Sequence, residues 1–208
     1  MYVGSHSGQY QDWRNLKYEH SISAQDVKYM FAGQVSYDLP IGKGQLVDLN
    51  GVGNVIAGGW TINGILYLGS GIPVASPTVG SAVAYFRQRP NQICNPSRGF
   101  SRGVSQWVNN SCFASPASPF VAGTAPAYLD SARAMGARNL DLSIYKTFKL
   151  KDSMVFRIDA SAYNVTNKPQ FGLPTEQTMT VSGGAPFGAL TSTINTPRQF
   201  QFGARFNF

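Results

Sequence analysis

The chain has 208 residues, enough for one domain with a core, but only 13% of them are charged, about half of the share in a typical soluble domain. A mean hydropathy of -0.14 and the lack of any apolar run of roughly 18 residues exclude a protein that crosses a membrane with helices. The net charge of +7 comes from 17 dispersed Lys and Arg residues without a nucleic-acid-binding motif, so nucleic acid is not an expected partner.

The first clear strand is predicted at residues 28–39. Apolar side chains such as Phe31 and Val35 share one parity there, and polar side chains such as Gln34 share the other. This period of two is typical of a β-strand with one apolar face. Upstream, residues 2–7 suggest the end of a further strand.

A second strand is predicted at residues 60–72, after one or two short helical turns within residues 46–57. Ile65 departs from its alternation, because it falls on the polar parity. Residues 73–138 are rich in Ser, Pro, Gly and Ala and show little periodicity. We expect a structureless loop there, and a loop of this length argues against a compact soluble domain.

The clearest hairpin joins predicted strands at residues 139–150 and 154–165 through the short polar connection 151–153. Both strands alternate between apolar and polar side chains. Lys146 interrupts the apolar parity of the first one. A lysine at such a position requires a nearby membrane interface that its ammonium group can reach.

A second long loop, 166–196, leads to the terminal strand at residues 197–208. Its four phenylalanines share one parity, and they are Phe200, Phe202, Phe206 and Phe208. In a soluble protein such an end would form a sticky, exposed edge. Transmembrane β-barrel strands instead alternate apolar-out and polar-in and carry aromatic girdles at the membrane interfaces. The predicted fold is therefore all-β, an antiparallel transmembrane β-barrel segment of about five to six strands with long extracellular loops.

A terminal aromatic strand of this kind also resembles the signal by which outer-membrane barrel proteins are recognised for insertion. That resemblance makes the four phenylalanines of the last strand the candidate insertion signal, with the barrel-assembly machinery as a partner.

The lengths of the connections are consistent with this fold. If the last strand runs toward the periplasm, the loops 73–138 and 166–196 lie outside the cell, and the connections 41–59 and 151–153 lie in the periplasm. The two longest connections then fall on the extracellular side, as they do in outer-membrane barrels.

The only two cysteines, Cys94 and Cys112, lie in the first long loop. An extracytoplasmic location permits a disulfide, which would contribute about 3 kcal/mol in the loop-entropy account. Two free thiols are the alternative, and a metal pair lacks a nearby histidine. Alkylation without a reductant distinguishes these states.

Catalytic and metal-binding patterns are missing from the sequence. It contains no GxSxG, no HExxH and no phosphate-binding loop with its Lys-Ser/Thr pair, and its two histidines are isolated. We therefore expect neither an enzyme nor a cofactor. Candidate functional residues lie on the polar parity of the last strands, where they would face the barrel interior: Arg157, Asp159, Tyr163 and Arg205. Contact with a substrate or plug is one interpretation of these residues, and charge pairing inside a wet barrel is the other.

Four blocks of sequence resemble one known family. Residues 137–174, ARNLDLSIYKTFKLKDSMVFRIDASAYNVTNKPQFGLP, are similar to the penultimate hairpin of TonB-dependent outer-membrane receptors. The subgroup is the one with a carboxypeptidase-regulatory-like amino-terminal domain. The blocks VSYDLPIGKGQ, IAGGWTINGILYLGSGIPV and RQFQFGARFNF look like the same subgroup. The resemblance implies ligand uptake across the outer membrane by a barrel of about 22 strands with a plugged lumen, energised by a TonB-type protein.

In such a receptor this chain would be the carboxy-terminal part of the barrel. Five or six strands leave two open sheet edges, which lipid does not tolerate, so we expect the rest of the barrel, a plug domain and outer-membrane lipid as partners. The amino terminus lacks the features of a secretory signal. Two rival functions remain open: a non-transporting outer-membrane barrel with adhesive loops, and a secreted carbohydrate-binding β-sandwich.

Overall fold

The computed structural model describes residues 10–12, 14–79, 88–151, 154–181 and 186–208. They form two compact units, each considered by itself below. The predicted strand end at residues 2–7 lies outside the described residues. None of the helices in the described ranges has the length and apolar character that crossing a membrane requires.

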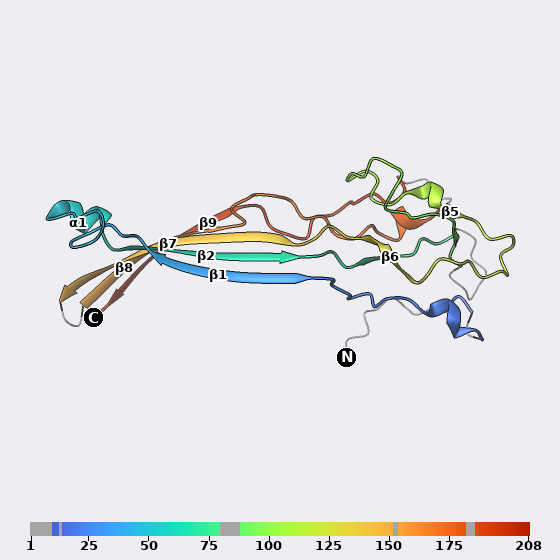
Figure 1. Cartoon of the computed structure of the whole chain (residues 1–208), viewed down its shortest axis with the longest axis horizontal. Helices are drawn as coiled ribbons and strands as arrows, with labels where there is room; N and C mark the ends of the chain where they lie inside the picture. Colours follow the sequence, from blue (N-terminus) through green and yellow to red (C-terminus); the bar gives the residue numbers. More distant parts are fainter. Residues whose placement is uncertain (1–9, 13, 80–87, 152–153, 182–185) are drawn as a thin grey trace. The chain divides into compact units, whose positions relative to one another are not determined.

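One unit is built on a five-stranded sheet with the strand order β1-β2-β7-β8-β9 (Figure 1). Its strands are β1 (Met30–Asp38), β2 (Trp60–Gly69), β7 (Arg138–Lys151), β8 (Met154–Tyr163) and β9 (Gln199–Asn207). Every neighbouring pair is antiparallel. The prediction of an antiparallel all-β fold is confirmed.

The register places the apolar parity of all five strands on one face, because residues paired directly across antiparallel strands point the same way. Ile62 pairs with Ile144, for example, and Ala160 pairs with Phe202. The apolar face consists mainly of Phe31, Val35, Tyr37, Trp60, Ile62, Leu66, Leu68, Leu140, Leu142, Ile144, Phe148, Phe156, Ile158, Ala160, Ala162, Phe200, Phe202, Ala204 and Phe206. The opposite face is mostly polar and includes Gln34, Ser36, Asp38, Thr61, Asn63, Asp141, Ser143, Tyr145, Thr147, Arg157, Asp159, Ser161, Tyr163, Gln199, Gln201 and Arg205.

The second strand is shorter than the sequence predicts, since β2 ends at Gly69 and not at residue 72. Beyond it, a Cβ atom on Gly71 would lie 1.9 Å from the carbonyl oxygen of Ala134, so only glycine allows this approach of two backbones. The chain then enters a separate two-stranded sheet, in which β3 (Pro73–Ala75) pairs with β6 (Tyr128–Arg133).

The fourth strand also ends early, at Tyr163 and not at residue 165. Asn164 takes the left-handed conformation with φ 49°, which asparagine tolerates better than most residues. Its backbone N–H donates to the Asp141 carboxylate at 2.8 Å. Its side-chain amide donates to the carbonyl of Thr196 at 2.9 Å. These bonds bring the chain before β9 back to the end of β8.

The other unit combines three separate stretches of the chain, Met1–Lys28, Ser70–Gly136 and Gln170–Ile194. Besides the β3–β6 pair it contains a two-residue pairing of β4 (Asn91–Gln92) with β5 (Phe113–Ala114). Its 3-10 turns are η1 (Leu16–Glu19), η2 (Asn110–Cys112) and η3 (Gln177–Met179). The expectation of a structureless loop at residues 73–138 is therefore wrong.

A buried apolar cluster holds this unit together. It consists of Val74, Val108, Cys112, Phe113, Leu129, Ala132 and Met179. Trp107, Leu173, Val181 and Phe187 pack against it. Because its members come from short segments far apart in the sequence, no stretch of the chain shows a periodic apolar pattern that would reveal the cluster.

Candidate functional site

The apolar face of the sheet is a candidate contact surface of the chain. Phe202 is 80% exposed, Phe200 65% and Val35 62%, although a soluble sheet would bury such side chains. Between Phe200 and Phe202 and the small side chains of Ala160 and Ala162 lies a groove of about 410 Å³ with an almost wholly apolar lining. A face of this kind suits hydrocarbon better than water.

The candidate insertion residues lie at this face or just beyond it. Phe200, Phe202 and Phe206 belong to β9 and pair with apolar-face residues of β8. Phe208 follows the end of β9, is 93% exposed and stacks on Phe206 with ring centroids 6.0 Å apart. Their recognition by an assembly machinery stays a prediction.

The four predicted interior-facing residues lie together on the polar face of β8 and β9. Arg157 pairs directly with Arg205 across the two strands. The Arg157 guanidinium lies 4.0 Å from the ring centroid of Tyr145 and 3.8 Å from the Asp159 carboxylate. Tyr163 approaches Gln201 with 3.3 Å between their side-chain oxygens. Since the Arg157 and Asp159 side chains are 45% and 32% exposed, this ion pair contributes less than about 1 kcal/mol.

Gly203 makes room for the Asp159 carboxylate. It pairs with Asp159 across β8 and β9, and a Cβ atom at position 203 would lie 2.6 Å from a carboxylate oxygen of Asp159. The glycine thus lets the carboxylate lie close to the neighbouring strand.

Lys146 interrupts the apolar face, but it is not exposed there. The side chain reaches the end of helix α1 (Val52–Ala57), in the connection between β1 and β2. Its ammonium group donates hydrogen bonds to the carbonyl oxygens of Val55 and Gly58, to Ile56 at 3.3 Å and to Asn54 at 3.4 Å. Lys146 is only 5% exposed. The expected snorkelling toward an aqueous interface is therefore wrong, because these carbonyls solvate the ammonium group in place of water.

A disulfide closes part of the other unit. Cys94 and Cys112 are joined, with their Cα atoms 4.8 Å apart. Cys112 is fully buried in the apolar cluster beside Phe113. The bond therefore connects a surface loop to the core, which agrees with the pairing proposed from the sequence.

A buried ion pair joins the amino-terminal stretch to the first long loop. Arg89 donates to the two carboxylate oxygens of Glu19 at 2.8 and 3.2 Å and to the carbonyl of Ala125 at 2.9 Å. The two side chains are 8% and 18% exposed. Next to them, Gln11 donates to the carbonyl of Gly123 at 2.9 Å and accepts from the backbone N–H of Arg89 at 2.7 Å. Sequence periodicity does not reveal this arrangement.

A second charged cluster surrounds Arg133 at the end of β6. Arg133 pairs with Asp26 at 2.5 Å and with Asp130 at 3.1 Å, and Lys28 lies 3.4 Å from Asp130. The hydrogen bond from Arg133 and the charge of Lys28 hold the pKa of Asp130 below its usual value. Burial acts to lower the pKa of Arg133, but the bonds to the two carboxylates outweigh it and raise that pKa.

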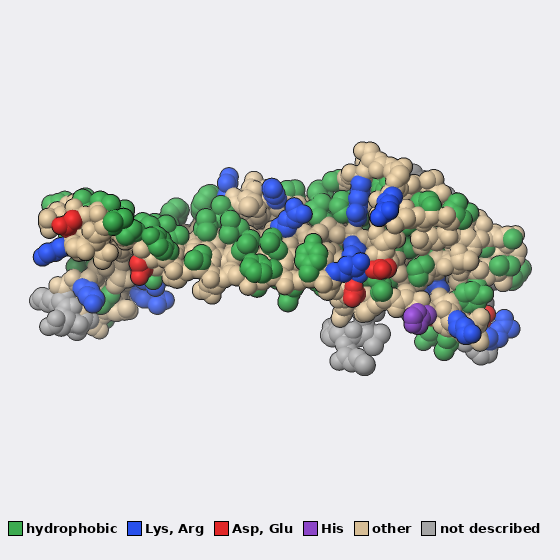
Figure 2. Space-filling view, viewed as in Figure 1, with side chains coloured by type: hydrophobic (Ala, Val, Ile, Leu, Met, Phe, Trp, Pro, Cys, Tyr) green, Lys and Arg blue, Asp and Glu red, His purple; other side chains and the backbone are tan. Residues whose placement is uncertain are grey.

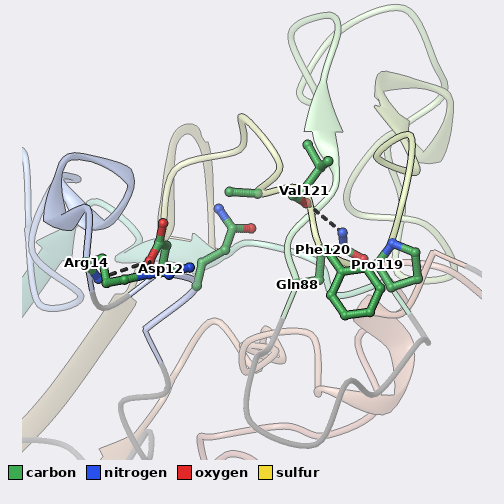
Figure 3. Close-up of a pocket in the computed structure, with 8 residues that line it drawn as sticks. Asp12, Arg14, Gln88, Pro119, Phe120 and Val121 are labelled. Carbon is green, nitrogen blue, oxygen red and sulfur yellow. Dashed lines mark hydrogen bonds and ion pairs between the residues drawn. The ribbon is translucent and has the colours of Figure 1, made fainter.

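A cavity of about 150 Å³ lies at the surface of the same unit (Figure 3). Its lining comprises Gln11, Asp12, Arg14, Gln88, Pro119, Phe120, Val121 and Ala122. Asp12 and Arg14 form an ion pair at 3.5 Å. Gln88 donates to the carbonyl of Val121 at 2.6 Å. The cavity combines a charged edge with the exposed ring of Phe120 and has the size for a small polar group.

Comparison with known proteins identifies the family. Residues 2–201 match the model of the outer membrane beta barrel domain. The chain belongs to this family. No curated protein and no solved structure matches the chain. The outer membrane beta barrel domain is located in the outer membrane, so the location predicted from the alternating strands is confirmed.

The two faces of the sheet resemble the two faces of a strand in an outer-membrane barrel. In outer-membrane barrels the apolar side chains face lipid and the polar side chains face the interior. The face with Phe200 and Phe202 has the apolar character of the first kind, and the face with Arg157 and Arg205 has the polar character of the second. An interior position for Arg157, Asp159, Tyr163 and Arg205 stays a prediction. The exposed apolar face also argues against a secreted β-sandwich, which would bury these side chains against a second sheet.

Proposed function

We propose that this outer membrane beta barrel domain forms the carboxy-terminal strands of a TonB-dependent receptor that takes up a ligand across the outer membrane. The observation that carries the proposal is the pair of sheet edges. Among the described strands, β1 pairs only with β2 and β9 only with β8. Lipid does not tolerate open sheet edges, and bacterial single-chain barrels have at least about eight strands. Five strands are thus one sector of a larger barrel.

The size and type of that barrel are proposed from sequence similarity. The hairpin β7–β8, the strand β2 and the terminal strand β9 carry the blocks that resemble TonB-dependent receptors. In that class about 22 strands surround a plugged lumen. The rest of the barrel, a plug domain and a TonB-type energy-coupling protein are the corresponding partners, together with outer-membrane lipid and the barrel-assembly machinery.

The interior face supports this function through its charges. Arg157 and Arg205 lie directly opposite each other on neighbouring strands, where like charges repel. Asp159 offsets part of this charge at 3.8 Å from Arg157. On β8 and β9 alone one positive charge remains, which favours an acidic group of the plug or of a passing ligand beside these two strands. We assign no catalytic residue, cofactor or nucleic-acid partner to this surface.

The unit that contains the disulfide is proposed to meet the ligand outside the cell. The stretches that form it connect to the sheet at one end, where β2 and β8 end and β1, β7 and β9 begin. Long connections of outer-membrane barrels lie on the extracellular side. The cavity beside Asp12, Arg14 and Phe120 is the candidate first contact with the ligand.

The reading frame upstream of residue 1 tests the proposal directly. We expect it to encode a plug domain and the remaining barrel strands in the same polypeptide. A frame that begins with an export signal and encodes no plug would overturn the assignment to TonB-dependent receptors and favour a non-transporting barrel with adhesive loops.

Uptake by whole cells provides the functional test. Cells with and without the gene are given a defined mixture of ferric siderophores, maltodextrins and oligopeptides, and depletion of each compound from the medium is measured by mass spectrometry. We expect the deletion to abolish depletion of one class, and a protonophore to abolish it in cells that keep the gene. Equal depletion of every class, together with weaker attachment of the deletion strain to surfaces, would favour adhesion.

A further inference from the structure

We propose that helix α1 and the turn before it form a membrane anchor that lies in the periplasmic leaflet of the outer membrane. The anchor comprises Leu46, Val47, Val52, Val55 and Ile56. The inference rests on the outer-membrane location of the domain and does not depend on the proposed transport function.

Two side chains place α1 over the lipid face of the sheet. Trp60 and Lys146 are paired across β2 and β7, and their parity is that of Ile62 and Ile144 on the apolar face. The indole N–H of Trp60 donates to the carbonyl of Ile56 at 2.9 Å. The Lys146 ammonium binds four carbonyls within residues 54–58. Side chains that leave the sheet on the lipid side thus hold the carboxy-terminal end of α1.

The outer surface of α1 is apolar and exposed. Val52 is 73% exposed, Val55 57% and Ile56 67%, and Leu46 in the preceding turn is 87% exposed. Neither the first nor the last turn of the helix carries a charged residue. Figure 2 shows hydrophobic side chains gathered where α1 lies in Figure 1. Exposed side chains of this kind on one short segment indicate a contact with an apolar phase.

The position of this exposed surface of α1 favours a contact with lipid. It adjoins the apolar face of β2 and β7, which already faces hydrocarbon in an outer-membrane barrel. The helix lies at the end of the sheet where β1 ends and β2 begins, which is the periplasmic end if the long connections are extracellular. Trp60 beside it matches the enrichment of tryptophan at membrane interfaces. Interfacial segments bind lipid through buried apolar area in this way.

Lys146 supplies hydrogen bonds that the end of a six-residue helix needs at a membrane surface. The last carbonyls of a helix have no partner within the helix, and lipid offers none. The Lys146 ammonium supplies hydrogen-bond donors to the carbonyls at the end of α1, and these oxygens solvate its charge. Lys146 lies 5.0 Å from the ring centroid of Phe148 and 5.8 Å from that of Trp60, so aromatic rings shield the ammonium group as well. In this proposal Lys146 is a positioning residue for the anchor.

Spin labels at single engineered cysteines test the contact with lipid. Because Cys94 and Cys112 are paired, an added cysteine supplies the reactive thiol of this chain. The protein is purified at its native length from outer membranes, with V55C, I56C or, as the control, D48C, and placed in phosphatidylethanolamine–phosphatidylglycerol vesicles. Asp48 belongs to the same connection, and its charged side chain is exposed, so a label there should lie in water.

We expect labels at positions 55 and 56 to collide with oxygen more often than with a water-soluble nickel chelate, and the label at position 48 to show the reverse. The ratio of the two collision rates should differ several-fold between the two groups. Equal access of nickel to all three positions would overturn the anchor. Protection of positions 55 and 56 from both reagents would indicate a protein partner and would also overturn it.

A substitution of Lys146 tests its positioning role. In the I56C background, K146M should increase the mobility of the label and its access to nickel, because the carbonyls of Val55 and Gly58 lose the donor that Lys146 supplies. K149M is the matched control, since Lys149 lies on the opposite parity of the same strand. An unchanged label in K146M protein that still floats with the outer membrane would show that Lys146 does not hold the anchor.

Discussion

The two units of this domain distribute their side chains in opposite ways. Every buried hydrophobic residue in the described part of the chain belongs to the unit with the disulfide, among them Val108, Leu129 and Met179. The sheet unit instead exposes large apolar side chains such as Val35 and Phe202. The difference teaches that the surrounding medium, water for one and lipid for the other, decides which side chains each unit turns outward.

Charged residues follow the same division. In the disulfide-containing unit Arg89 and Glu19 form an ion pair with 8% and 18% of their side chains exposed. In the sheet, Arg157 and Asp159 remain 45% and 32% exposed on the polar face. This ion pair thus contributes to the interior of one unit, whereas Arg157 and Asp159 stay at the surface of the other.

The largest effect is expected from breaking the buried ion pair. E19A leaves the Arg89 guanidinium buried without its partner, and we expect the free energy of unfolding of this unit to fall by about 3–5 kcal/mol. The matched control is D12A, which removes the partner of the exposed Arg14 and should cost less than about 1 kcal/mol. Hydrogen exchange measured by mass spectrometry reports the local stability. Equal protection in the two variants would contradict the comparison.

A charge on the lipid face should have the next largest effect. I144R places a guanidinium on the apolar face and should lower the free energy of unfolding by about 2–4 kcal/mol if Ile144 lies near the midplane of the bilayer. S143R introduces the same side chain at the neighbouring position on the interior face and should be nearly neutral. Urea unfolding in phospholipid vesicles measures both variants. If S143R were the more damaging substitution, the assignment of the faces would be reversed.

Removal of the disulfide tests how the disulfide-containing unit is stabilised. The double variant C94S/C112S should lower the stability of this unit by about 3 kcal/mol, because the unfolded chain regains the entropy of an open loop. The sheet should keep its stability, since the bond lies entirely within the other unit. Hydrogen exchange distinguishes the two units. Loss of protection in β7 and β8 would show that the units unfold together.

The smallest effect is expected from Asp130, which is exposed. Its pKa is depressed in the folded state by Arg133 and Lys28, so it contributes stability above its unfolded pKa of about 3.9. This contribution is lost as the pH falls from that value through the lower folded pKa. D130N should therefore flatten the acid limb of a plot of stability against pH. Urea unfolding measured at a series of acidic pH values checks this expectation, and identical slopes in both proteins would contradict it.

Local alternation was sufficient to predict the sheet. The parity of Phe31 and Val35, or of Phe200 and Phe202, directly indicates which side chains share a face, and the register across β1, β2, β7, β8 and β9 preserves it. The strand ends were less predictable. β2 stops before residue 72 because Gly71 approaches the backbone of Ala134, a contact between residues far apart in the sequence.

The fold of the disulfide-containing unit could not be predicted in the same way. Val74, Val108 and Leu129 are single apolar residues in polar surroundings, and only the fold brings them together. Lys146 is partly predictable from the sequence. Its wrong parity is visible in the sequence, but the carbonyls that bind it belong to a helix about 90 positions earlier, and alternation carries no information about such a partner.

The disulfide-containing unit is assembled from three separate stretches of the chain, and this affects the order in which it can fold during biogenesis. The disulfide between Cys94 and Cys112 needs only the first long loop, so it can form while the chain is still being exported. The core needs Met179 as well, and the backbone N–H groups of Trp107 and Leu190 bond across the two long loops at 3.0 and 2.8 Å. This unit therefore completes its fold only after the β7–β8 hairpin has been synthesised. An export intermediate that stops before residue 170 would carry an oxidised but unfinished loop, open to periplasmic chaperones and proteases.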